Sequence, residues 1–139
     1  MARPSILVGV DFSEPAARAL VEARTMARAL DADVQVVHVA PAIGVYGGEP
    51  AGGGWLAANE LAVEDLEVRC GTPWVELARH ASEHRSRLIV VGSHGGRGYQ
   101  PVSLGSTALR LTLAATRPVV VVGQRVTAAS RPGSALAHR

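Results

Sequence analysis

Short runs of apolar, β-branched residues alternate along this chain with segments whose apolar residues recur at helical spacing. Four such runs predict strands over residues 6–10, 34–39, 87–91 and 119–122, and the alternating apolar and polar residues 66–70 predict a fifth. Three intervening segments predict helices: residues 14–30, 73–84 and 106–115. Regular alternation of strand and helix is typical of an α/β fold with a parallel sheet.

The residues at which these segments begin and end support the same fold. Ser13 is a typical helix N-cap with Pro15 in the first helical turn, and Arg117 before Pro118 disfavours further helix. Five βα units in about 124 residues predict an open doubly wound sheet, because a TIM barrel needs roughly twice that length. We therefore expect one domain over residues 1–124 and a disordered tail over residues 125–139.

The connection between the second and third strands departs from this regularity. Residues 41–54 carry six glycines and two prolines, which predict a mobile loop. A short helical segment over residues 55–62 follows the loop. The second helix is therefore expected to be shortened, which leaves the cover of one sheet face open to question.

Composition excludes several kinds of chemistry. The 139 residues include fourteen arginines and no lysine, so neither a P-loop nor a lysine Schiff base can be present. Twelve acidic residues leave a formal charge of +2, and no arginine cluster or aromatic surplus favours nucleic acid as a partner. The apolar run at residues 6–10 is too short for a signal-peptide core or a membrane span. We expect a cytoplasmic protein.

Several individual residues have structural interpretations. Cys70, the single cysteine, is expected to be a small buried thiol. His80 and His84 lie four residues apart on one predicted helix, a spacing that suits a metal, but without a third ligand a solvated helix face is favoured. His38 is expected to be a hydrogen-bonded core histidine, and Trp55 a packing residue.

The strongest chemical signal follows the fourth predicted strand. Gly92 and Gly95 would let the backbone approach a ligand, and Gly105, Ser106 and Thr107 stand where the next helix opens. Amide N–H groups and the helix dipole favour an anion at such a helix start, and the two hydroxyls can bind phosphate oxygens or a metal. Local composition alone favours an anion site no more than an ordinary loop in which Ser106 only caps the helix.

The spacing of this segment, Gly-x2-Gly-x9-Gly-Ser, resembles the ATP-binding motif of the universal stress protein family. Other features agree with that family in order over about residues 4–124: the opening residues 6–13, residues 37–39, the turn at 71–73, the strand exit at 88–94 and the closing residues 117–122. The resemblance implies a Rossmann-like fold with strand order 3-2-1-4-5. It also implies a set of nucleotide-binding residues: Val10, Asp11, Val39, Gly92, His94, Gly95, Gly105, Ser106 and Thr107.

The family assigns roles within this set. Asp11 would accept a hydrogen bond from a ribose hydroxyl, although an aspartate at a strand end often only caps the next turn. Val39 would present backbone groups to the adenine edge, or serve simply as sheet core. His94 would line the nucleotide, with a surface loop position as the alternative. Magnesium would accompany the phosphates, with no protein cage of its own.

These features support three hypotheses about function. The first is an adenine-nucleotide-binding module, with ATP as the ligand, that acts in stress response or signalling through an unknown partner. The second is a slow ATPase, against which stand the missing lysine and the lack of a recognisable general base. The third is a dimeric interaction protein without nucleotide. Family members commonly dimerise through the fifth strand, here Val119, Val120, Val121 and Val122.

Overall fold

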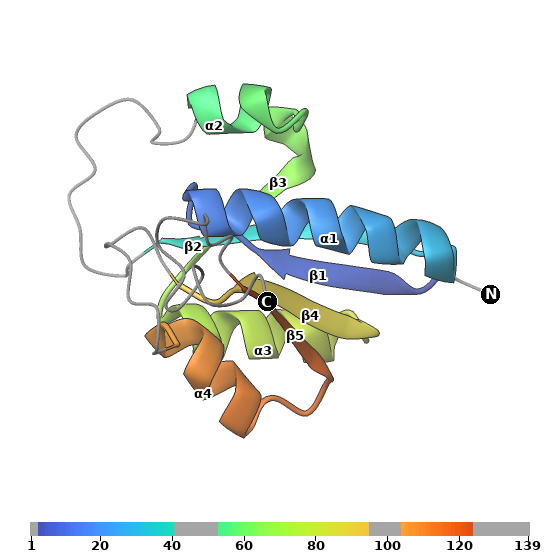
Figure 1. The fold of residues 1–139 in the computed structure, drawn as a ribbon. Helices are drawn as coiled ribbons and strands as arrows, with labels where there is room; N and C mark the ends of the chain where they lie inside the picture. The colour runs from blue at the N-terminus through green and yellow to red at the C-terminus, as the bar shows by residue number, and fades with distance from the viewer. Residues whose placement is uncertain (1–2, 41–52, 95–103, 124–139) are drawn as a thin grey trace, which may run out of the picture.

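A computed structural model describes residues 3–40, 53–94 and 104–123. Its centre is a five-stranded sheet in the order β3-β2-β1-β4-β5, and every neighbouring pair is parallel (Figure 1). The strands are β1 Ser5–Gly9, β2 Asp33–Ala40, β3 Leu66–Cys70, β4 Leu88–Gly92 and β5 Val119–Val122. The predicted fold class and strand order are confirmed, with strand limits that differ by at most one residue at each end.

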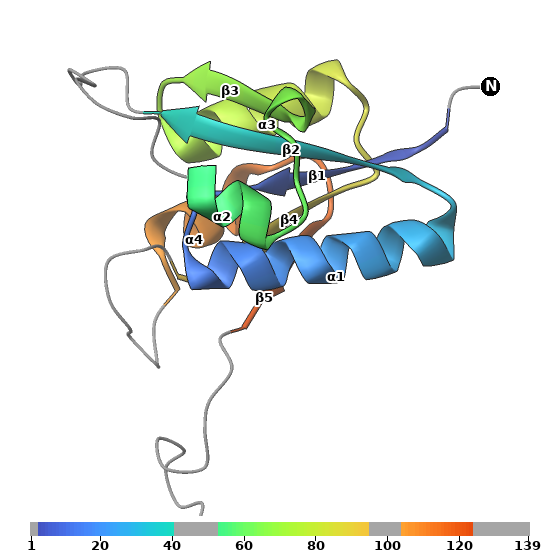
Figure 2. The ribbon, with the colours of Figure 1, turned by 90° about the horizontal axis from the view of Figure 1, so that it is seen from above.

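Helices cover both faces of the sheet. The helical elements are α1 Glu14–Leu30, α2 Gly53–Ala58, the 3₁₀ turn Val63–Asp65, α3 Pro73–Glu83 and α4 Ser106–Ala114. Helices α1 and α2 lie on one face, while α3 and α4 lie on the other (Figures 1 and 2). The winding direction therefore reverses between β1 and β4, as expected for a doubly wound sheet.

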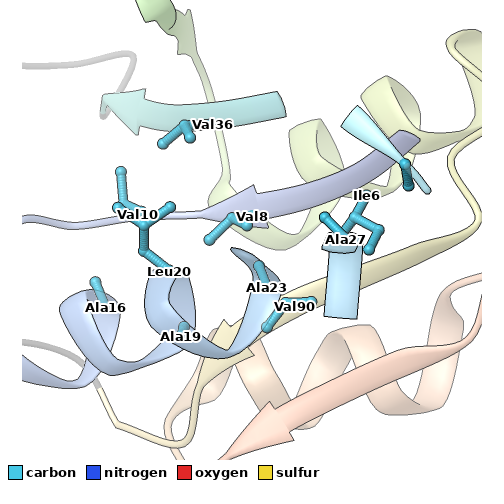
Figure 3. Packing of buried hydrophobic residues seen from close by; sticks show 11 residues of the cluster. Ile6, Val8, Val10, Ala16, Ala19, Leu20, Ala23, Ala27, Val36 and Val90 are labelled. Atoms are coloured by element: carbon cyan, nitrogen blue, oxygen red, sulfur yellow. The ribbon is translucent and has the colours of Figure 1, made fainter. Parts of the chain in front are cut away.

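Helix α1 lies close to the sheet because its inner face is built from small side chains. Ala16, Ala19, Ala23 and Ala27 are buried, and Figure 3 shows them beside the strand residues of the same cluster. At the start of the helix, the Ser13 side chain accepts a hydrogen bond from the Ala16 amide, so the predicted N-cap is confirmed.

The two faces of the sheet form two hydrophobic clusters. Alternate strand residues enter each cluster, since successive side chains of a strand point to opposite faces. The α1 face includes Ile6, Val8, Val36 and Val90, and the α3–α4 face includes Leu7, Val37, Ile89, Val91 and Leu111. The continuous apolar runs in the sequence are explained by this burial on both sides.

The second helix is short, as expected, but its position differs slightly from the prediction. It spans Gly53–Ala58 rather than residues 55–62. Of the predicted loop over residues 41–54, residues 41–52 lie outside the described residues, and Gly53 and Gly54 belong to the helix. Val68, on the edge strand β3, is 57% exposed on the side of the sheet that α2 would otherwise cover. The shortened helix thus leaves β3 partly uncovered on the α1 face.

The expectation that Cys70 is buried is wrong. Cys70 ends the edge strand β3 and is exposed. It alternates in phase with Leu66 and Val68, so its side chain is directed to the same sparsely covered face.

His80 also departs from the sequence prediction of a solvated helix face. Its side chain is 2% exposed, and its ring stacks on that of His84 with centroids 3.9 Å apart. The Nε2 atom lies 3.3 Å from a Glu67 carboxylate oxygen of β3, whereas the buried Nδ1 atom has no hydrogen-bond partner. Burial lowers the pKa of His80 below its ordinary 6.5, His84 and Arg69 lower it further, and Glu67 opposes this shift.

We predict that His80 makes the protein less stable in mild acid. Unfolded His80 titrates near its ordinary pKa and folded His80 titrates lower, so the unfolded chain binds more protons between these two values. The contribution is complete above about pH 6.5 and is lost as the pH falls below that value. Urea denaturation between about pH 7.5 and 5 measures this slope, and His80→Gln should flatten it. Parallel curves for the two proteins would contradict the assignment.

Candidate functional site

The carboxyl ends of β1 and β4 lie side by side at the point where the winding direction reverses. The pairs Ile6–Leu88 and Val8–Val90 set the parallel register of these strands. Continued for two and three further residues, that register places Val10 level with Gly92 and Asp11 level with Ser93. Doubly wound sheets bind ligands at such a reversal, so both motifs found in the sequence meet at the expected location.

The turn after β1 is held by Asp11 and Ser13. The Asp11 Oδ1 atom accepts hydrogen bonds from the amide of Ser13, at 3.1 Å, and from the Ser13 hydroxyl. Between them, Phe12 has a φ of 62°, in the left-handed region that bulky residues rarely adopt. The capping role considered for Asp11 is therefore real. A carboxylate offers about four lone-pair positions, so this role is compatible with ligand binding.

Both the side chain and the backbone of Val10 make structural contacts within the sheet and its cover. The side chain is buried against α1 (Figure 3), and the amide donates to the Val37 carbonyl at 2.9 Å. The Val10 carbonyl accepts a hydrogen bond from His38 Nδ1 at 2.8 Å. The expectation of a hydrogen-bonded His38 is confirmed, with the ring half-buried rather than fully enclosed.

Val39 has a buried side chain and a backbone directed toward β1. In β2, Val37 accepts from Val10 of β1, and Ala40 accepts from Gly71 beyond β3. Because a parallel ladder alternates between the two neighbours, the N–H and C=O of Val39 face the β1 side. The ladder ends at the Gly9–Val37 pair, and within the described part of the chain no hydrogen bond joins Val39 to β1.

A cluster of three ring side chains connects the β1–α1 turn to α2. Phe12 packs on the His38 ring at 4.4 Å between centroids and meets the edge of Trp55 at 5.7 Å. Trp55 Nε1 donates to the Ser13 carbonyl at 2.9 Å. The prediction of Trp55 as a packing residue is confirmed, but its bond to the β1–α1 turn has no sequence signal.

Gly92 has a packing role in addition to any contact with a ligand. A Cβ atom at this position would lie 2.8 Å from Pro15 Cβ and 2.9 Å from the Pro15 carbonyl carbon and oxygen. The first turn of α1 thus packs directly against the end of β4. This contact explains the glycine without a ligand, an explanation that the motif alone could not reveal.

The loop between β4 and α4 is tied together at its ends. Ser93 is buried, its amide donates to Val122 O at 2.9 Å, and its carbonyl accepts from the Gly105 amide at 2.6 Å. The Ser93 Oγ atom also lies 2.8 Å from His94 Nδ1. Gly95 and the middle of the motif, residues 95–103, lie outside the described residues.

Helix α4 opens without a side-chain cap. Gly105 is the N-cap residue, and Ser106 is the first residue of the helix, so Ser106 does not have the capping role considered for it. Ser106 is exposed and Thr107 is half-buried. The first amides of the helix and these two hydroxyls provide the donors expected for an anion, except that the Gly105 amide already binds Ser93.

Other kinds of site find no support in the described parts of the chain. No group of three or more His, Cys, Asp or Glu side chains there could hold a metal ion. No helix within residues 3–40, 53–94 and 104–123 is long and apolar enough to cross a membrane.

The fold and the site define a class: α/β proteins with a doubly wound parallel sheet and a glycine–serine loop at its switch point. Residues 3–123 match the model of the universal stress protein family. The chain belongs to this family, and the resemblance seen in the sequence is confirmed.

Individual relatives agree. The chain is 28% identical to a universal stress protein of Methanocaldococcus jannaschii, over 84% of this chain and 80% of the relative. A universal stress protein of Mycobacterium tuberculosis is 30% identical over 86% of this chain, which spans about half (48%) of that relative. Among solved structures, UspA from Lactobacillus plantarum has a TM-score of 0.67 and 25% identity, with 88% of this chain and 99% of that chain covered.

We predict that Gly92→Ala destabilises the protein by about 1–3 kcal/mol, because the new methyl group would overlap the Pro15 backbone. The free energy of unfolding in urea measures the effect. Gly123→Ala is the matched control, since a Cβ there meets nothing within 4 Å. Equal stability of the two variants would show that the Gly92–Pro15 contact is not a close one.

Proposed function

We propose that this protein binds ATP at the carboxyl ends of β1 and β4 and acts as a stress-response or signalling module. The observation that carries the proposal is the convergence of Asp11 with both ends of the Gly92–Ser106 motif at the switch point. We assign the nucleotide-binding domain to residues 1–124 and the cytoplasm as its compartment.

In this proposal the triphosphate lies at the start of α4. The amides and hydroxyls of Ser106 and Thr107 donate to phosphate oxygens, and the dipole of the nine-residue helix adds a favourable field. Because the chain has no lysine, backbone and hydroxyl donors supply these contacts, and any permanently cationic side chain at the phosphates has to be an arginine. Magnesium, bound with the phosphates, would neutralise part of their charge.

The nucleoside occupies the space beside β1 and β2. Asp11 accepts a hydrogen bond from a ribose hydroxyl, and the N–H and C=O of Val39 pair with the adenine edge. Gly92, His94 and Gly95 border the nucleotide. One solved structural neighbour, with a TM-score of 0.60 and 21% identity, is a universal stress protein in complex with cAMP, which supports an adenine nucleotide as the ligand class.

We predict that ATP with magnesium binds the protein and raises its apparent stability, by about 2.7 kcal/mol at a free concentration 100 times Kd. Isothermal titration gives Kd, and thermal unfolding gives the stability. The double variant Ser106→Ala and Thr107→Ala should weaken binding about tenfold or more, because hydrogen bonds to charged groups are the stronger ones.

Thr112→Ala is the matched control for this double variant. Thr112 lies in the same helix, and its hydroxyl donates to the Ala108 carbonyl at 2.8 Å rather than facing the helix start. It should leave Kd unchanged. No heat and no stability gain at millimolar ATP would refute ATP binding. Sustained phosphate release above a buffer control, abolished by Gly105→Ala, would instead favour the slow-ATPase alternative.

We also propose a homodimer formed through β5. This strand is the edge of the sheet, and all four of its valines are only partly buried. The Pro118 and Val122 carbonyls accept from Ile89 and Ser93, so the alternating ladder directs the amides of Val119 and Val121 outward. Such an apolar edge is suited to pair with a second copy.

We predict that Val121→Pro converts the dimer to a monomer without unfolding it. Proline removes an outward-facing N–H and spares the hydrogen bonds to β4. Val121→Ala is the control, because it loses most of the same side chain but keeps the N–H. Light scattering at micromolar concentration gives the mass. A monomeric wild type, or a dimeric proline variant, would contradict pairing through β5.

A further inference from the structure

His38 binds a backbone carbonyl that would otherwise accept a hydrogen bond from the neighbouring strand. In the ladder between β1 and β2, the next hydrogen bond after Val10 N–H to Val37 would run from the Val39 amide to the Val10 carbonyl. That carbonyl instead accepts from His38 Nδ1 at 2.8 Å. The imidazole therefore replaces a backbone donor at the point where the ladder stops.

The His38 ring approaches the Val10 carbonyl from one face of the sheet. His38 alternates in phase with Val36, which places its side chain on the α1 face. A ring on that face approaches the Val10 carbonyl from one side of the sheet, whereas the Val39 amide would approach it within the plane of the sheet. The ring is fixed there by Phe12, which packs on it at 4.4 Å and is itself held by Trp55.

We propose that His38 is a positioning residue that keeps the Val39 N–H and C=O available for a nucleobase edge. By binding the Val10 carbonyl, it stops β1 and β2 from pairing for one more step. This inference rests on the proposed function for its ligand, an adenine base. Adenine presents an acceptor at N1 beside a donor at N6, which is complementary to the N–H and C=O of one extended residue.

His38→Leu removes the donor, and the Val10 carbonyl then becomes available to the Val39 amide. We expect ATP affinity to fall about 3- to 10-fold, the loss equivalent to one neutral hydrogen bond. Inosine triphosphate, which reverses the donor and acceptor at this edge, should be little affected. The ratio of the two affinities should therefore fall toward one, a change that general destabilisation would not produce.

His38→Asn should rescue the wild-type ratio, because the Asn amide nitrogen and His Nδ1 both lie two bonds from Cβ. His84→Leu is the matched control. It removes another imidazole–carbonyl bond, from His84 Nδ1 to His80 O at 3.0 Å, at the far end of α3. Equal ATP affinity and equal base discrimination in the leucine and asparagine variants of His38 would overturn the proposal.

A second measurement separates this proposal from nucleotide binding itself. Amide hydrogen exchange at Val39, followed by NMR without ligand, should be faster in the wild type and His38→Asn than in His38→Leu. If the wild type binds no nucleotide, the proposed function fails, and this exchange pattern still decides the role of His38. Exchange at Val39 that is equally slow in all three proteins would overturn that role.

Discussion

The contact between Gly92 and Pro15 is the constraint on which the arrangement of the site depends. Because Gly92 has no side chain, the first turn of α1 lies directly against the end of β4. The start of α1 fixes the turn from Asp11 to Ser13, since the Ser13 side chain caps the helix and Asp11 binds Ser13. One missing Cβ atom thus sets how closely the β1–α1 turn approaches the end of β4.

The residue after Gly92 extends this constraint to the opposite face of the sheet. Ser93 binds the Val122 carbonyl through its amide and the Gly105 amide through its carbonyl. The end of β5 and the start of α4 are therefore joined to the same short stretch of backbone. A displacement of this backbone would therefore shift both the turn after β1 and the donors at the start of α4, because closely packed interiors have low compressibility and transmit strain.

Much of this architecture could be predicted from the sequence because its causes are local. Apolar β-branched runs predicted four strands, alternating apolar and polar residues predicted β3, and Ser13 with Pro15 predicted the start of α1. The limits of α2 could not be predicted in the same way. The helix ends at Ala58, and Arg24 of α1 binds the carbonyls of Asn59 and Glu60 just beyond it, a contact made only in the folded chain.

The location of the candidate site was predicted from the sequence, but its supporting contacts were not. Asp11, Gly92 and Ser106 lie at or beside the switch point, because parallel strands place their carboxyl ends together. The hydrogen bond of His38 to the Val10 carbonyl joins two strands, and the contact of His80 with Glu67 joins α3 to β3. Interactions between elements that are distant in sequence leave no local pattern.

The absence of lysine affects which groups can bind the phosphates at the proposed site. Rapid phosphoryl transfer relies on cations, such as a lysine, an arginine and magnesium, placed to neutralise the charge of the transition state. Here the Gly105 amide is bound to Ser93, so the donors at the start of α4 are fixed before any anion arrives. Two arginines of this region are engaged elsewhere, Arg110 over the Trp74 ring and Arg18 on the Gly123 carbonyl. Fixed donors lose little entropy on binding an anion, which favours nucleotide binding, while the missing lysine removes one cation that could promote cleavage.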